Sequence, residues 1–230
     1  LIDLFTQIVR EEQLEEKISA INVFGAIGKG KVDGDKRAST FMQYLKDIFP
    51  QANYQIQNAI ATSLLNLSSM QNYEFFITLL SSGDLPELRA IAAKALGRFA
   101  NKNAVPHLLD AFNEDDDSSV REQTIHSLTL LHAFEAVDYL ADRFMKVTSV
   151  NERDALLRFF WPAQSKTSIP AVIYILQNEQ DEFLRWYAIR LLDHLGAVEA
   201  LPILKEIAKS DPSARARELA KKAIDNLEYS

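Results

Sequence analysis

Arginine recurs in steps of 32 residues through the second half of this 230-residue chain. Apolar residues keep the same step, and one apolar slot holds Leu96, Leu128, Phe160, Leu192 and Ile224. Self-similarity with a period of about 20 to 50 residues is typical of proteins built from stacked repeats, in which each repeat packs on its neighbours. The sequence therefore predicts a repeat architecture in place of a single globular core. The recurring arginines are Arg89, Arg121, Arg153, Arg185 and Arg217.

Each repeat contains two segments whose apolar residues recur at i, i+3, i+4 and i+7, the pattern of an amphipathic α-helix. We name the first helix of each pair A and the second B. The seven glycines and seven prolines fall at the segment ends, which favours an all-helical reading. We expect an all-α fold, an α-solenoid of about seven helix pairs forming a single domain over residues 1–230. The expected pairs are about 1–28, 36–69, 71–100, 103–132, 135–164, 167–196 and 198–228, with a loop insertion at 28–36.

The two ends of the chain differ in character. The last helix presents Arg, Lys and Glu on its outer side, as a capping repeat does. The first segment, Leu1–Phe5, opens with apolar residues and no capping residue. We expect the native protein to continue beyond the Leu1 end, as part of a longer protein, or to cover that end with a partner.

Composition excludes several classes of function. The net charge of −7 argues against a nucleic-acid binder, which needs a basic surface. The absence of cysteine removes thiol nucleophiles and thiolate metal ligands. No apolar run reaches the roughly 18 residues of a membrane span, and no signal peptide is visible, so we expect a cytoplasmic protein. The histidines lack metal-ligand spacing and no catalytic motif occurs, so we predict no metal, no cofactor and no catalytic residue.

The best-preserved repeat resembles the HEAT family, in its short HEAT-like form of the phycobilisome-lyase type. The residues that carry the resemblance are Leu88-Arg89, Ala92, Ala95-Leu96-Gly97, Ala104-Val105-Pro106, Leu108-Leu109 and Phe112. The resemblance implies a right-handed α-solenoid with A helices outside and B helices lining a concave face. HEAT proteins are mostly scaffolds and adaptors, a few are bilin lyases or alkyl-purine DNA glycosylases, and one group is a di-iron hydroxylase. The family by itself implies no single activity.

The five periodic arginines, called the arginine ladder below, lie near the start of the B helices. A cation gains nothing there from the helix dipole, which favours anions, so a specific acceptor must compensate. We expect this acceptor to be an acidic loop residue such as Asp84, Asp116 or Asp181. The resemblance to HEAT proteins implies that the ladder ties neighbouring repeats together.

A second basic row follows the ladder by five residues. In three repeats an acid precedes the base by four positions, which stabilises an exposed helix by only a few tenths of a kcal/mol. One reading is therefore a solvated face with helix ion pairs, and the other is a basic stripe that meets an acidic partner. Arg190 lacks the preceding acid and is the member most free to bind. The row consists of Lys94, His126, Arg158, Arg190 and Lys222.

Aromatic residues interrupt the repeat pattern in the C-terminal half. Trp161 stands in the slot of Gly97, and Pro162 is expected to end its helix early. Since Trp, Tyr and Arg dominate binding hot spots, we predict a partner-binding patch, with local repacking around an irregular loop as the alternative. The predicted partner-binding residues are Lys94, His126, Arg158, Trp161, Phe183, Trp186, Tyr187, Arg190 and His194.

These features together favour a non-catalytic scaffold or adaptor that presents its B-helix face to a protein or peptide, possibly an acidic one. The first alternative is a bilin-lyase-like chaperone of an anionic tetrapyrrole, in which Arg158 and Arg190 would meet the propionates and Trp186 and Tyr187 would stack. The second alternative is a DNA-lesion glycosylase, which the acidic charge disfavours.

Overall fold

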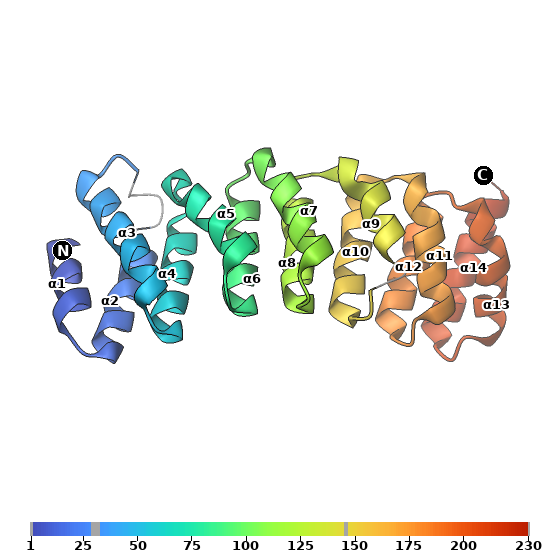
Figure 1. Cartoon of the computed structure of the whole chain (residues 1–230). Helices are drawn as coiled ribbons and strands as arrows, with labels where there is room; N and C mark the ends of the chain where they lie inside the picture. Colours follow the sequence, from blue (N-terminus) through green and yellow to red (C-terminus); the bar gives the residue numbers. More distant parts are fainter. Residues whose placement is uncertain (1, 29–32, 145–146, 230) are drawn as a thin grey trace. The chain divides into compact units, whose positions relative to one another are not determined.

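The computed structural model describes residues 2–28, 33–144 and 147–229, and within them it shows fourteen α-helices and no strand (Figure 1). The prediction of an all-α fold with about seven helix pairs is confirmed. The A helices are α1 (Ile2–Glu11), α3 (Lys36–Ile48), α5 (Tyr73–Ser82), α7 (Val105–Glu114), α9 (Val137–Arg143), α11 (Ile169–Asn178) and α13 (Leu201–Ser210). The B helices are α2 (Leu14–Ile27), α4 (Tyr54–Leu67), α6 (Pro86–Arg98), α8 (Ser118–Leu130), α10 (Val150–Ala163), α12 (Glu182–His194) and α14 (Ala214–Glu228).

The helix starts follow local rules. A proline occupies the first turn of α7, α11 and α13, where a missing N–H removes no intrahelical hydrogen bond. Several B helices begin with a side-chain cap: the Asp181 carboxylate accepts the N–H groups of Phe183 and Leu184, and Ser213 accepts that of Ala216. The pairing of helices is thus specified by residues at their ends as well as by their apolar faces.

The residues divide into two compact units, Leu1–Leu131 with α1 to α8 and His132–Ser230 with α9 to α14. That all helices form one repeat domain stays a prediction. In each unit the periodic apolar slot of the B helices is core: Leu96 and Leu128 in the first unit and Phe160 and Leu192 in the second are fully buried.

The insertion predicted at 28–36 lies partly outside the described residues, since 29–32 are not described. Its end is anchored, because the Asp35 carboxylate caps α3 by accepting the N–H groups of Arg37 and Ala38. Asp33 accepts a hydrogen bond of 2.6 Å from the Ser69 hydroxyl, which joins this segment to the residues that follow α4.

The B helices approach one another to different extents. A Cβ added to Gly97 on α6 would lie 2.7 Å from the Ser127 Cβ on α8, so only glycine permits this approach. In the second unit Trp161 occupies the corresponding slot, and α10 and α12 approach each other closely over a shorter stretch. The prediction that Pro162 ends this helix early is wrong: α10 continues to Ala163, because a proline in the last turn removes only one donor.

Candidate functional site

Three arginines of the ladder, Arg89, Arg153 and Arg185, form bidentate ion pairs between consecutive repeats. Arg89 Nε and Nη2 donate to the Asp115 carboxylate at 2.6 and 2.9 Å. In the second unit Arg185 donates to Asp211 through the same two atoms, at 2.9 Å each. Arg153 pairs likewise with Glu179, at 2.6 and 3.3 Å. Each acid follows its arginine by 26 residues and caps the C-terminus of an A helix of the next repeat.

The acceptors expected from the sequence, Asp84, Asp116 and Asp181, were therefore the wrong residues. The loop that precedes each ladder arginine supplies backbone carbonyls instead of a carboxylate. Arg121 donates to the Asp115 carbonyl at 2.7 Å, and Arg217 donates to the Pro212 carbonyl at 3.2 Å. The carboxylate comes from one repeat further along, a long-range contact that no local rule predicts.

Burial and hydrogen bonding act in opposite directions on the two acids of the second unit. Burial would raise the pKa of Glu179 and of Asp211, but the hydrogen bonds from Arg153 and Arg185 and from loop N–H groups outweigh it. The net effect lowers the pKa of both carboxyls below their usual values. Both groups are therefore held as carboxylates in the folded protein.

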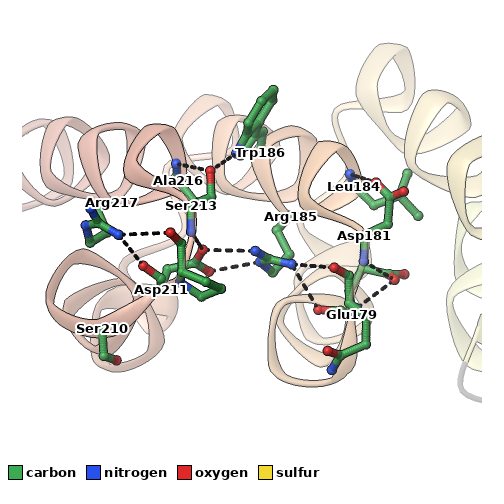
Figure 2. A network of polar contacts seen from close by, with 12 residues as sticks. Glu179, Asp181, Leu184, Arg185, Trp186, Ser210, Asp211, Ser213, Ala216 and Arg217 are labelled. Carbon is green, nitrogen blue, oxygen red and sulfur yellow. Dashed lines mark hydrogen bonds and ion pairs between the residues drawn. The ribbon is translucent and has the colours of Figure 1, made fainter.

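Ser213 joins the ladder to Trp186, as Figure 2 shows. The Ser213 N–H donates to the Asp211 carboxylate at 2.8 Å, which fixes the loop before α14. Its hydroxyl oxygen accepts a hydrogen bond of 3.0 Å from the Trp186 indole nitrogen. The indole is thus positioned by the same loop that anchors Arg185.

Trp161 lies at the centre of a group of rings and cations on α10 and α12. The His194 ring stacks on it with the ring centroids 5.0 Å apart, and the Tyr187 ring meets it edge-on at 5.3 Å. The guanidinium of Arg190 lies 5.5 Å from the centre of the Trp161 ring, and that of Arg158 lies 5.7 Å from the Tyr187 ring. Such distances are those of cation–π contacts.

A second group surrounds Trp186, between α12 and α14. Phe183 meets the indole edge-on at 4.8 Å, although 64% of its surface is exposed. Arg215 of α14 lies over the same indole at 5.7 Å. Sequence reasoning missed Arg215, because α14 reads as a polar capping helix. Together the two groups form what we call the aromatic face, made of Arg158, Trp161, Phe183, Trp186, Tyr187, Arg190, His194 and Arg215.

Two hollows open on the aromatic face. The first, of about 250 Å³, lies among Phe183, Trp186, Tyr187, Arg215 and Leu219. The second, of about 310 Å³, is bordered by Trp161, His194, Asp193 and Lys222. Arg190 and Leu219 line both.

The remaining predicted binding residues lie elsewhere. Lys94 is exposed on α6 and His126 is half-buried on α8, both in the first unit. Two of the expected acid-then-base pairs are in contact: Glu122 with His126 at 3.5 Å, and Asp154 with Arg158 at 2.7 Å, the latter an ion pair. The hydrogen bond with Asp154 raises the pKa of Arg158. The structure therefore gathers seven of the nine predicted residues within the second unit, and these two belong to the first.

Metal-ligand clusters and membrane-spanning helices are both absent from the described residues. Among them no cluster of three or more histidine, aspartate or glutamate side chains is placed to hold a metal ion. No helix in the described segments has both the length and the apolar character required to cross a membrane.

Solved structures share this fold at low sequence identity. A chain of the CpcE–CpcF complex of phycocyanin lyase from Nostoc is 17% identical, with a TM-score of 0.56 and coverage of 99% of this chain and 94% of that chain. Importin beta is 13% identical with a TM-score of 0.67, and the match covers 98% of this chain but 36% of importin beta. At these identities the likeness shows the fold alone. A search of curated protein sequences gives no match.

The family model of HEAT repeats matches residues 38–129 and 136–225, well over half of the chain. The match includes the arginine ladder and the aromatic face. The stacked helix pairs and the periodic core are those of a repeat protein, in agreement with the family match. The chain therefore belongs to the HEAT-repeat family and has its α-solenoid fold.

Proposed function

We propose that this protein is a non-catalytic scaffold whose aromatic face binds an acidic segment of a partner protein. The observation that carries the proposal is the juxtaposition of cations with rings that are partly exposed, or largely so at Phe183 and His194, on three neighbouring B helices. Trp, Tyr and Arg are the residues that contribute most to binding at protein interfaces.

The core of the repeat does not account for these side chains. In the slots of Phe183 and Trp186, the B helix two repeats earlier, α8, carries Ser119 and Glu122, which are polar. Phe183 remains largely exposed even with Trp186 against it. A large exposed aromatic side chain on a helix whose core slots are already filled is better explained by binding than by folding.

Charge supports an acidic partner. Arg158 pairs with Asp154, whereas Arg190, Arg215 and Lys222 form no ion pair with any carboxylate in the described part of the chain. The whole chain carries a net charge of −7, so this local excess of cations is a specific feature of the face. Complementary charge of this kind steers a partner and selects against basic ones.

The experiment that tests the proposal compares the wild-type chain with the double variant Trp186→Ala, Arg190→Glu as bait for proteins from the source organism. The matched control is Tyr139→Ala, Lys166→Glu, which likewise replaces an aromatic residue by Ala and a cation by Glu, at exposed positions outside the aromatic face. We expect a partner that is retained by the wild type and the control and lost by the face variant. Retention of the same partner by all three proteins would refute the proposed site.

A tetrapyrrole chaperone is the second candidate, because Arg158 and Arg190 lie directly beside Tyr187 and Trp161, as the propionates and rings of a bilin require. Titration with a free bilin distinguishes the two functions. A shift of the bilin absorbance with the wild type, absent with the face variant, would support this candidate. An unchanged spectrum would dismiss it.

A further inference from the structure

We infer that the segment bound by the aromatic face contains an apolar side chain and a carboxylate close together in its sequence, one for each hollow. This inference rests on the proposed function and specifies the chemistry of the partner. It follows from the different linings of the two hollows and from the wall that they share.

The first hollow suits an apolar side chain. Its walls are the rings of Phe183, Trp186 and Tyr187 and the side chain of Leu219. Arg158, which pairs with Asp154, and Arg215 also line it and lie over Tyr187 and Trp186. A ring or branched aliphatic group placed here would exclude water from three aromatic surfaces, and burial of that apolar area favours binding.

This hollow is preformed. The Ser213 hydroxyl holds the Trp186 indole at 3.0 Å, and Phe183 and Arg215 contact the same ring. Ordering a large side chain at an interface costs conformational entropy, and a fixed indole avoids part of that cost.

The second hollow suits a carboxylate. Arg190 and Lys222 bring positive charge to it, and no acid in the described residues is paired with either. Its own acid, Asp193, accepts hydrogen bonds of 3.0 and 3.1 Å from the Asn226 amide at its two oxygens. The hollow therefore offers two cationic donors, Arg190 and Lys222, to an incoming anion, against the single carboxylate of Asp193, whose two oxygens are bonded to the Asn226 amide.

The shared wall sets the spacing. Arg190 and Leu219 line both hollows, so only one arginine and one leucine side chain separate the two occupants. One extended residue spans about 3.3 Å, so groups within about three residues of each other on one peptide can fill both. A single short segment is sufficient, and two partners are unnecessary.

The test uses a displayed library of random twelve-residue peptides, selected for binding to the wild type and against binding to the Trp186→Ala, Arg190→Glu variant. Trp161 and Trp186 are the two tryptophans of the chain, so the affinity of each selected peptide without tryptophan can be measured from protein fluorescence. We expect selected peptides to carry an apolar residue within three positions of Asp or Glu. Replacing the apolar residue by Ser, or the acid by Asn or Gln, should each weaken binding about tenfold, as loss of a hot-spot contact does.

Two further variants assign each group to its hollow. Phe183→Ala should abolish the effect of the apolar residue and keep that of the acid, and Lys222→Gln should do the reverse. If peptides distinguish wild type from variant but depend on charge alone or on the apolar residue alone, the inference is overturned while the proposed function stands. If no peptide distinguishes the two proteins, the aromatic face is not the interface and both fall.

Discussion

Removal of the Asp211 carboxylate probes the ladder where it is most buried. In the Arg185–Asp211 pair the side chains are 8% and 5% exposed, the lowest arginine exposure among the ladder pairs. Asp211→Ala leaves Arg185 Nε and Nη2 without their carboxylate and also removes the acceptor of the Ser213 N–H.

The expected cost is large, because the variant keeps a buried charge and deletes its partner. Breaking a buried ion pair in this way costs about 3–5 kcal/mol, far more than the net contribution of an exposed pair. The carbonyl of Gln180 still accepts from Arg185 Nη1 at 2.8 Å, which favours the lower part of that range. With a urea m-value of about 2 kcal/mol/M, a cost of about 3–4 kcal/mol should lower the unfolding midpoint by about 1.5–2 M.

Tryptophan fluorescence is the appropriate assay, because both tryptophans lie in the second unit with this pair, so their signal follows the unfolding of that unit. Asp225→Ala, at an exposed position of α14, is the matched control and should change stability by no more than about 0.5 kcal/mol. A loss below about 1 kcal/mol for Asp211→Ala, or equal losses for the two variants, would refute the view that the ladder stabilises the stacking of repeats.

Three other predictions follow from the same geometry. The pKa values of Glu179 and Asp211 are lowered in the folded state, so their contribution to stability is present above about pH 4 and is lost as the pH falls through the folded pKa values. Urea unfolding at pH 7 and below pH 4 measures this loss. Ser213→Ala removes the acceptor of the Trp186 indole and a helix cap, so stability should fall by about 1–2 kcal/mol and the tryptophan emission should shift. Gly97→Ala places a Cβ 2.7 Å from the facing side chain on α8 and should cost about 1–3 kcal/mol in thermal or urea unfolding.

Each of these has an outcome that contradicts it. The first comparison is the difference in unfolding free energy between the wild type and a chain lacking both acids. If this difference is the same at pH 7 and below pH 4, the lowered pKa values contribute nothing to stability. Unchanged emission in Ser213→Ala would show that the indole is held by its ring contacts alone. A Gly97→Ala protein as stable as the wild type would show that α6 and α8 can separate without cost.

The helix pairs were predictable because the signals that specify them are local. Amphipathic spacing, prolines at the second helical position and polar caps all lie within one segment. The described residues form fourteen helices, in agreement with the expected number of about seven pairs. The prediction from Pro162 was wrong because a proline in the last turn of α10 removes one hydrogen-bond donor without ending the helix.

The partners of the ladder were predicted wrongly, although a signal for them was present. Asp115, Glu179 and Asp211 occupy one slot of the 32-residue period, just as the arginines do. A search limited to the loop before each arginine selects the nearest acid in sequence. The actual acceptor comes from the following repeat, because stacking brings the C-terminus of the next A helix against the arginine.

The sequence by itself determined the period, the helical pairs, the core slots and the aromatic residues that depart from the repeat. These properties repeat along the chain, so comparison of one repeat with the next reveals them. Only the tertiary structure decided that Arg215 lies over Trp186, that Ser213 holds the indole, and that Arg190 separates two hollows. Those contacts join different helices. They depend on the distance and the angle at which neighbouring helices pack, and both depend on the size of the side chains at the helix contacts, such as Trp161.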